Sequence, residues 1–270
     1  MAANTTLKSG STRDTSFWST GVIPVDGDKV TISKLGTATS RVTSSAISAG
    51  ATNVPVTAGT GTGLIGECIE FDTRPGEYYE LTTGFTASAG TAVVTPALAG
   101  AIASGATLRN RGHRANLLCA NRLTDATGYA IGSTVITLQA GSLSILTGNM
   151  VRFGADPVFY KVQTGAPAGA GTVTLVSGIT TAIPASATAC TESCVWGDDT
   201  STGVTVNGIL YFDRAAQSSV VVKGTYTVSA TGTEDRGTAI DKITGVNATL
   251  LLNYSAAMAA NKYGATYAAG

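Results

Sequence analysis

An internal repeat limits the folds that this chain can adopt. The segment Leu64–Phe71 (LIGECIEF) matches Leu146–Phe153 (LTGNMVRF) at an offset of 82 positions. After a deletion of one residue, Gly90–Thr95 matches Gly171–Val176 at an offset of 81. A fixed period in a sequence indicates repeated structural units. We therefore predict two copies of one module.

The repeated segments have the pattern of strands. Short runs rich in β-branched and aromatic residues, such as Cys68–Phe71 and Met150–Phe153, are separated by Gly, Thr and Ala, which is a strand signal and not a helix signal. Each module is predicted to be a small antiparallel barrel or sandwich of about five or six strands. The predicted modules cover residues 46–108 and 128–189, and a linker at 109–127 joins them.

The segments that flank the modules show a second pattern. Short apolar runs such as Val30–Ile32 and Gly203–Phe212 alternate with glycine turns, as in the coils of a β-solenoid. Residues 1–40 and 200–270 are therefore predicted to form one discontinuous β scaffold. The predicted fold class is all-β: a short solenoid-like or sandwich scaffold into which two tandem barrel or sandwich modules are inserted.

The flanking segments also resemble a known kind of scaffold. The residues that carry the resemblance are Trp18, Pro24, Gly27, Asp28, Val30 and Ile32, followed by Val204, Val206, Gly208, Leu210, Phe212, Gly224 and Arg236–Thr238. This pattern is similar to the β-helix-like scaffold of many phage and bacterial surface proteins, although a long insertion separates its two parts here. The modules are similar to small Gly-, Ala- and Thr-rich β units in structural proteins of tailed bacteriophages. The resemblance implies virion architecture and no reaction.

The charge balance restricts the partners. Charged residues make up 13% of the chain, and 17 basic side chains balance 17 acidic ones, whereas typical soluble domains carry roughly 25% charged residues. Zero net charge argues against a nucleic-acid partner, which requires a basic excess, and against a membrane surface. No apolar stretch approaches the length of a membrane span. No secretory signal is visible at the N-terminus, so we expect assembly in the host cytoplasm.

The cysteines are expected to remain thiols in a reducing cytosol. There are four of them: Cys68, Cys119, Cys190 and Cys194. A disulfide between Cys190 and Cys194 is the open alternative. Cys68 aligns with Met150, which indicates a buried apolar position. Because His113 is the only histidine and no second Cys or His pair has zinc spacing, no metal or cofactor is expected.

The densest charge in the sequence surrounds His113. It consists of Arg109, Arg111, Arg114 and Arg122. These arginines are candidates for contacts with an acidic patch on a partner subunit; the alternative is that they keep an inter-module linker soluble. No aromatic residues interleave with them, which argues against stacking on nucleic-acid bases.

Carboxylates crowd the first module. They are Glu67, Glu70, Asp72, Glu77 and Glu80. Paired carboxylates can hydrolyse a glycosidic bond, but the second copy has Arg152 and Lys161 where the first has Glu70 and Glu80. These charge reversals favour exposed positions, with ion pairing between modules or simple solvation. No enzyme is expected, because one histidine and no nucleophile elbow also leave a serine triad unsupported.

Two acidic pairs could bind calcium, but neither has the spacing of a calcium loop. They are Asp198–Asp199 and Glu234–Asp235. An aromatic group is predicted to fill the core where the modules rejoin the scaffold, with carbohydrate stacking as the alternative. It comprises Phe17, Trp18, Trp196, Tyr211 and Phe212.

These features favour a capsid-associated structural protein of a tailed phage. A cement or decoration protein of this kind binds the major capsid protein on the outside of the shell and forms a homo-oligomer, with a trimer favoured. The alternative is a tail-fibre or baseplate component that contacts the host surface, although the chain shows no cluster of exposed aromatics and no long repetitive shaft. A polysaccharide-degrading enzyme needs a carboxylate arrangement that the second module does not preserve.

Overall fold

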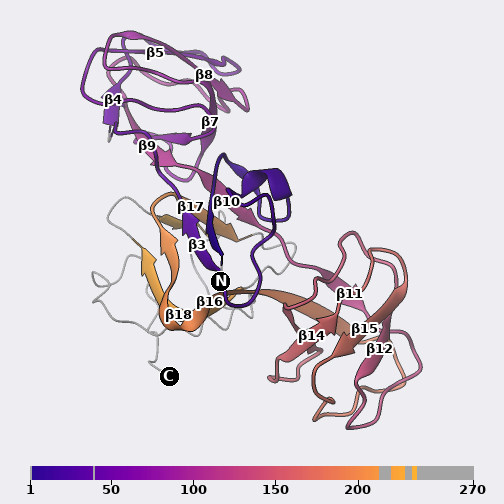
Figure 1. Cartoon of the computed structure of the whole chain (residues 1–270). Helices are drawn as coiled ribbons and strands as arrows, with labels where there is room; N and C mark the ends of the chain where they lie inside the picture. The colour runs from indigo at the N-terminus through magenta and orange to yellow at the C-terminus, as the bar shows by residue number, and fades with distance from the viewer. Residues whose placement is uncertain (1, 39, 213–219, 229–232, 236–270) are drawn as a thin grey trace.

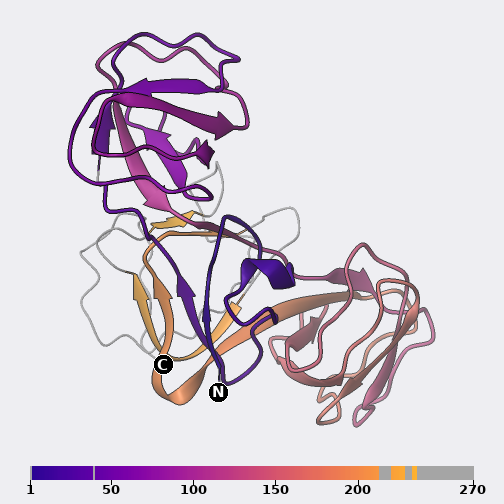
Figure 2. The same cartoon turned by 45° about the horizontal axis from the view of Figure 1, so that its top comes forward.

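The protein is all-β, as the sequence predicts. The structure is a computed structural model that describes residues 2–38, 40–212, 220–228 and 233–235. Within these ranges the elements are strands, apart from one 3-10 turn, η1 (Thr15–Phe17). Figures 1 and 2 show two modules on different sides of a central body, each joined to that body at one end.

The first module is a curled antiparallel sheet. Its strands, in spatial order, are β4 (Ser40–Val42), β9 (Thr107–Gly112), β6 (Cys68–Phe71), β7 (Tyr79–Thr83), β8 (Gly90–Thr95) and β5 (Asn53–Val56). An antiparallel bridge between Thr43 and Val56 connects the two ends of the sheet. The sheet thereby wraps around its own apolar core, in which Phe71 and Leu81 are fully buried.

The second module has the same strand order. Its strands are β11 (Asn121–Leu123), the first part of β16 (Ala189–Val206), β13 (Met150–Phe153), β14 (Tyr160–Thr164), β15 (Gly171–Leu175) and β12 (Val135–Leu138). A bridge between Thr124 and Leu138 connects its ends. Each strand thus has its counterpart at an offset of 81 or 82 positions, as the repeat requires.

Alternation of side chains builds both cores. Val54 and Val56 on β5 point inward, as do Ile136 and Leu138 on β12, while the residues between them do not. Successive side chains of a strand point to opposite faces. A shift of one residue would therefore expose the apolar set, which explains why the repeat keeps its phase.

The central body consists of two rows of parallel strands. The first row is β1 (Ala3–Thr5), β3 (Lys29–Ile32), the last part of β16 and β18 (Val220–Val228). The second row is β2 (Gly10–Ser11), β10 (Arg114–Leu117), β17 (Ile209–Phe212) and β19 (Thr233–Asp235). When the strands of the inserted modules are left aside, each strand of the first row is followed along the chain by one strand of the second. This is the arrangement of a β-solenoid, and we call the central body the solenoid.

Aromatic residues fill the core of the solenoid. Phe17, Trp18 and Trp196 are buried, and the rings of Trp18 and Trp196 meet edge to face at 6.1 Å. Tyr211 instead stacks on the guanidinium of Arg114, whose Cζ atom lies 4.1 Å from the centroid of the tyrosine ring. The side chain of Phe212 lies outside the described residues, as do Arg236–Thr238. The core-filling prediction therefore holds for the two tryptophans and Phe17.

The insertion points differ from the predicted domain boundaries. The chain leaves the solenoid for the first module after β3 and returns at β10, and the second module runs from β11 to the first part of β16. The segment 109–127, predicted as a linker, contains the end of β9, all of β10 and all of β11. Buried residues alternate there with more exposed ones: Asn110, Ala115 and Leu117 are buried, whereas Arg109 is exposed and Arg111 and Arg114 are half-buried. The high charge of this segment hides that strand pattern in the sequence.

The chain itself covers the N-terminal end of the solenoid. Leu7 donates its backbone N–H to Phe17 at 2.9 Å, and Ser19 donates to Thr5 at 2.8 Å. The segment around η1 therefore runs along the edge of β1 that faces away from β3. An unpaired edge would be a template for pairing with another chain, so this edge of β1 needs no partner chain to protect it.

Candidate functional site at the bases of the two modules

A buried carboxylate lies at the base of each module, where the module meets the solenoid. These are Glu67 and Glu192, both with no exposed surface. A buried carboxylate is costly unless several donors compensate it. The donors at each base therefore define how the module is attached.

Neutral donors surround Glu67 in the first module. Oε1 accepts the backbone N–H groups of Leu35 and Gly36, both at 2.7 Å. Oε2 accepts the N–H of Leu64 at 2.9 Å and the side-chain amide of Asn110 at 2.8 Å. Residues 35 and 36 belong to the segment that leaves the solenoid, so the carboxylate ties this segment to β6 and β9.

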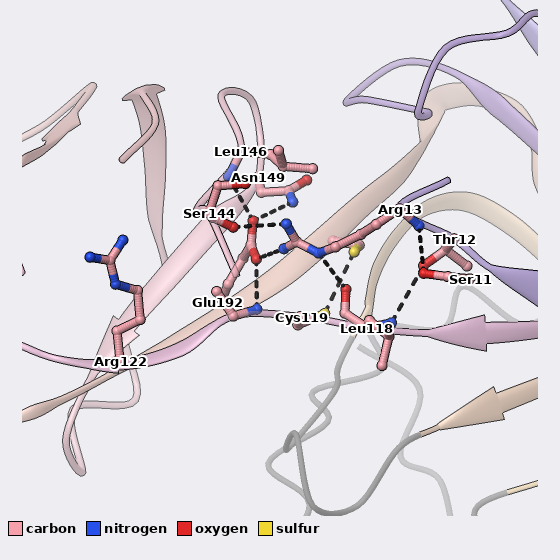
Figure 3. A network of polar contacts seen from close by, with 12 residues as sticks. Ser11, Thr12, Arg13, Leu118, Cys119, Arg122, Ser144, Leu146, Asn149 and Glu192 are labelled. Carbon is pink, nitrogen blue, oxygen red and sulfur yellow. Dashed lines mark hydrogen bonds and ion pairs between the residues drawn. The ribbon is translucent and has the colours of Figure 1, made fainter. Parts of the chain in front are cut away.

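Glu192 has the equivalent role in the second module, with one charged donor (Figure 3). Oε1 accepts the N–H of Leu146 at 2.9 Å and the side-chain amide of Asn149 at 2.7 Å. Oε2 accepts the N–H of Ala120 at 2.8 Å and pairs with the guanidinium of Arg13.

Arg13 joins the solenoid to the second module. It lies between β2 and η1, and only a tenth of its side chain is exposed. Besides Glu192, its guanidinium donates to the carbonyls of Leu118 at 2.9 Å and Ser144 at 2.7 Å. Leu118 precedes the module and Ser144 lies inside it, so one side chain holds both.

Equivalent turns of the two modules contact the N-terminal part of the solenoid. Gly66 and Gly148 have φ values of +86° and +88°, a backbone conformation that favours glycine. A Cβ at Gly66 would lie 3.3 Å from Lys8, and one at Gly148 would lie 3.8 Å from Val25. Both modules therefore use the same turn to dock.

The four arginines predicted as partner contacts differ in exposure and in the groups that they contact. Arg109 is exposed. Arg111 pairs with Glu70 of its own module at 2.5 Å, and Arg114 stacks on Tyr211. Arg122 is 3% exposed and serves its own barrel. Of the four, only Arg109 is exposed, and the prediction that these arginines contact a partner stays a prediction.

Arg122 and Arg41 occupy equivalent positions and close one side of each barrel. Arg122 donates from Nε to the carbonyl of Gln139 at 2.9 Å and from its terminal nitrogens to Pro167 and Gly169, each at 2.5 Å. The guanidinium of Arg41 donates to three loop carbonyls in the same way. They are those of Thr60, Gly61 and Thr86.

The positions at which charge is reversed between the modules are not simply exposed to solvent, as the sequence predicts, because their side chains have specific partners. Glu70 is buried and accepts from Arg111 and from the N–H of Gly76, so the prediction that it is exposed is wrong. Lys161 pairs with Asp26 of the solenoid at 2.6 Å. Burial raises the pKa of Glu80, the counterpart of Lys161. Among the described residues, no ion pair joins the two modules.

The cysteines are buried thiols. Burial raises the pKa of Cys68 to about 11, as expected for an unreactive position, and burial likewise raises the pKa of Cys190. Cys190 and Cys194 stand four residues apart on one strand, which separates them by about 13 Å. The Cys190–Cys194 disulfide is therefore excluded as long as β16 is formed.

No candidate metal site emerges from the described part of the chain, where no three His, Cys, Asp or Glu residues gather. The side chains of Asp198, Asp199, Glu234 and Asp235 lie outside the described residues. Within the described ranges, no helix has the length and apolar character needed to cross a membrane. No protein-family model and no curated protein matches the chain.

Sequence reasoning missed the residues that matter most at the bases. Glu192, Asn149, Asn110 and Arg13 carried no motif. A signal was nevertheless present, because Glu67 aligns with Asn149 and Asn110 with Glu192 at the same offset. An acid and an amide that exchange places across a repeat indicate a contacting pair. These groups satisfy one another in the interior, and Glu67 and Arg13 connect the modules to the solenoid.

Proposed function

We propose that the protein is a non-enzymatic structural component of a tailed-bacteriophage virion, of the cement or decoration type. It binds the outer capsid lattice and stabilises it. The observation that carries the proposal is that two modules with one strand order are each tied to one solenoid by polar contacts around a buried carboxylate. A binder built in this way fits a partner that repeats its binding sites.

A capsid lattice offers such repeated sites. When two linked modules bind at once, the second contact is intramolecular and the overall affinity exceeds that of either module. A rigid connection increases this gain, because less freedom is lost on binding. The major capsid protein is thus the proposed partner, and the particle surface is the proposed location after assembly in the host cytoplasm.

Equivalent apolar residues mark a surface that both modules share. Val42 on β4 is 39% exposed, and its counterpart Leu123 on β11 is 45% exposed. Both point away from the barrel core at the strand where the sheet closes. The low charge of the chain leaves few ionised groups to desolvate in such contacts. The proposed oligomer is a closed trimer, since closed symmetry satisfies self-complementary surfaces without forming fibres.

The test uses full-length protein and particles that lack it. We expect hundreds of bound copies per particle, counted by quantitative mass spectrometry, and particles that retain DNA at higher temperature once the protein is bound. A copy number set by the symmetry of the tail would replace the proposal with the tail-fibre or baseplate alternative. Absence of binding to both capsid and tail would overturn it.

A pair of variants tests the two-module contact. V42D and L123D each place a charge on one module at an exposed position, where folding is affected little. We expect each single variant to weaken capsid binding and the double variant to lose it by a far larger factor. Unchanged binding of the double variant would show that this surface is not the contact.

A further inference from the structure

Two thiols approach each other in the core of the solenoid. The Sγ atoms of Cys119 and Cys194 lie 3.5 Å apart, and both side chains are buried. Their strands are far apart in sequence, since Cys119 follows β10 and Cys194 lies in β16. The fold, and not local spacing, therefore creates the pair.

The pair lies where the chain enters and leaves the second module. Ala120, which follows Cys119, already donates to Glu192 of the module. Ser193, which precedes Cys194, is the last residue of β16 that pairs with β13. A covalent bond between the two sulfur atoms would thus join both connections of the module at its base.

We propose that Cys119 and Cys194 are a site of reversible disulfide formation that locks the base of the second module. A disulfide requires a sulfur–sulfur distance of about 2.05 Å, so the two atoms need to approach by about 1.5 Å. Rotation about the two χ1 angles would have to supply this approach. The inference goes beyond the proposed function and does not depend on which partner the modules bind.

A peroxide is the oxidant that suits this buried pair. One sulfur attacks a peroxide oxygen, which breaks the O–O bond and gives a sulfenic acid and one water. The second thiol then displaces the hydroxyl group as a second water, and the Sγ–Sγ bond forms. Two thiols and one hydrogen peroxide thus give one disulfide and two waters.

The environment of the pair slows its reaction with an oxidant. The hydrogen bond with Cys119, together with burial, raises the pKa of Cys194, and the thiolate is the reactive form. The thiols therefore persist in a reducing cytoplasm. Outside the cell, in an oxidising medium, the same pair can close.

The experiment treats the folded full-length protein with hydrogen peroxide, blocks the remaining thiols under denaturing conditions and analyses peptides without reduction. We expect blocked thiols to fall from four to two and one linked pair of peptides to contain Cys119 and Cys194. Dithiothreitol should restore all four. Loss of no thiol, or a linkage that involves Cys68 or Cys190, would overturn the proposal.

Matched variants give a second measurement. The closed loop spans the whole second module, so oxidation should raise the Tm of the wild-type protein by roughly 5–10 °C. C190S should retain this rise and C119S should lose it. If C119S does not fold, the peptide analysis of the oxidised wild-type protein still tests whether Cys119 and Cys194 are linked. A linkage that forms only after denaturation would also contradict the proposal, because the fold would then not bring the thiols together.

Discussion

Asn110 donates a hydrogen bond of 2.8 Å to Glu67 in the first module, and the second module has the two residue types exchanged, with Asn149 donating to Glu192 at 2.7 Å. Each base therefore contains one carboxylate and one amide, and either strand can supply the acid. The carboxylate is needed because the neighbouring backbone N–H groups converge on it. The amide is needed because a second buried acid would have no donor.

This exchange predicts compensation between two substitutions in the first module. E67N leaves two amides and N110E leaves two acids, so each single variant should lose about 1–3 kcal/mol of unfolding free energy. The double variant E67N/N110E recreates the arrangement of the second module and should recover a large part of this loss. A double-mutant cycle in urea measures the coupling. Additive losses would show that the two bases are not equivalent.

Arg13 should be the strongest single attachment of the second module. R13M keeps the length of the side chain but leaves Glu192 buried with neutral donors only. We expect it to lose about 2–4 kcal/mol, with faster hydrogen exchange in β11 and β13. K8M removes the exposed pair of Lys8 with Asp14 and should cost less than about 0.5 kcal/mol. Equal effects of R13M and K8M would refute the attachment role.

Replacement of Arg122 by lysine should destabilise the protein. Its planar guanidinium reaches three loop carbonyls at once, whereas an ammonium group is compact and has a different donor geometry. R122K should therefore cost at least about 2 kcal/mol in urea unfolding. R109K changes the same residue type at an exposed position and should stay within about 0.5 kcal/mol. A mild effect of R122K would mean that the loops close without the guanidinium.

The repeat and the strand pattern predict the all-β class and two tandem modules, because periodicity records which face of each strand is buried. They do not predict where the modules end. The strands at the module ends, β4, β9 and β11, are short or charged, and what makes them strands is pairing with residues far away in sequence, such as Arg41 with Leu108.

In the candidate site, too, only some features can be predicted from the sequence, and the others depend on contacts between distant residues. The unreactive nature of Cys68 can be predicted, since its repeat partner is Met150. The pairing of Arg13 with Glu192 cannot, because it joins residues 179 positions apart and has no counterpart in the first module. The burial of Glu70 was also hidden, because Arg111, which neutralises it, lies in the segment that composition assigns to a linker.

His113 should make the stability depend on pH near neutrality. Its Nδ1 lies 3.0 Å from both the carbonyl and the hydroxyl oxygen of Thr6, and the side chain is buried. Burial lowers the pKa of His113, and the nearby charge of Glu67 opposes this shift only in part. The unfolded chain, with a histidine pKa of about 6.5, therefore binds the proton more readily than the folded chain does.

Stability should consequently be complete above about pH 6.5 and be lost as the pH falls through the lower pKa of the folded state. Glu80 works in the opposite direction, because a carboxyl whose pKa is raised by folding gains stability on acidification. A fall in Tm between about pH 6.5 and 5.5 is thus assigned to His113, the only histidine of the chain. H113N cannot take up a proton in this range and should flatten the profile of Tm against pH. Parallel profiles of the variant and the wild-type protein would rule out His113 as the titrating group.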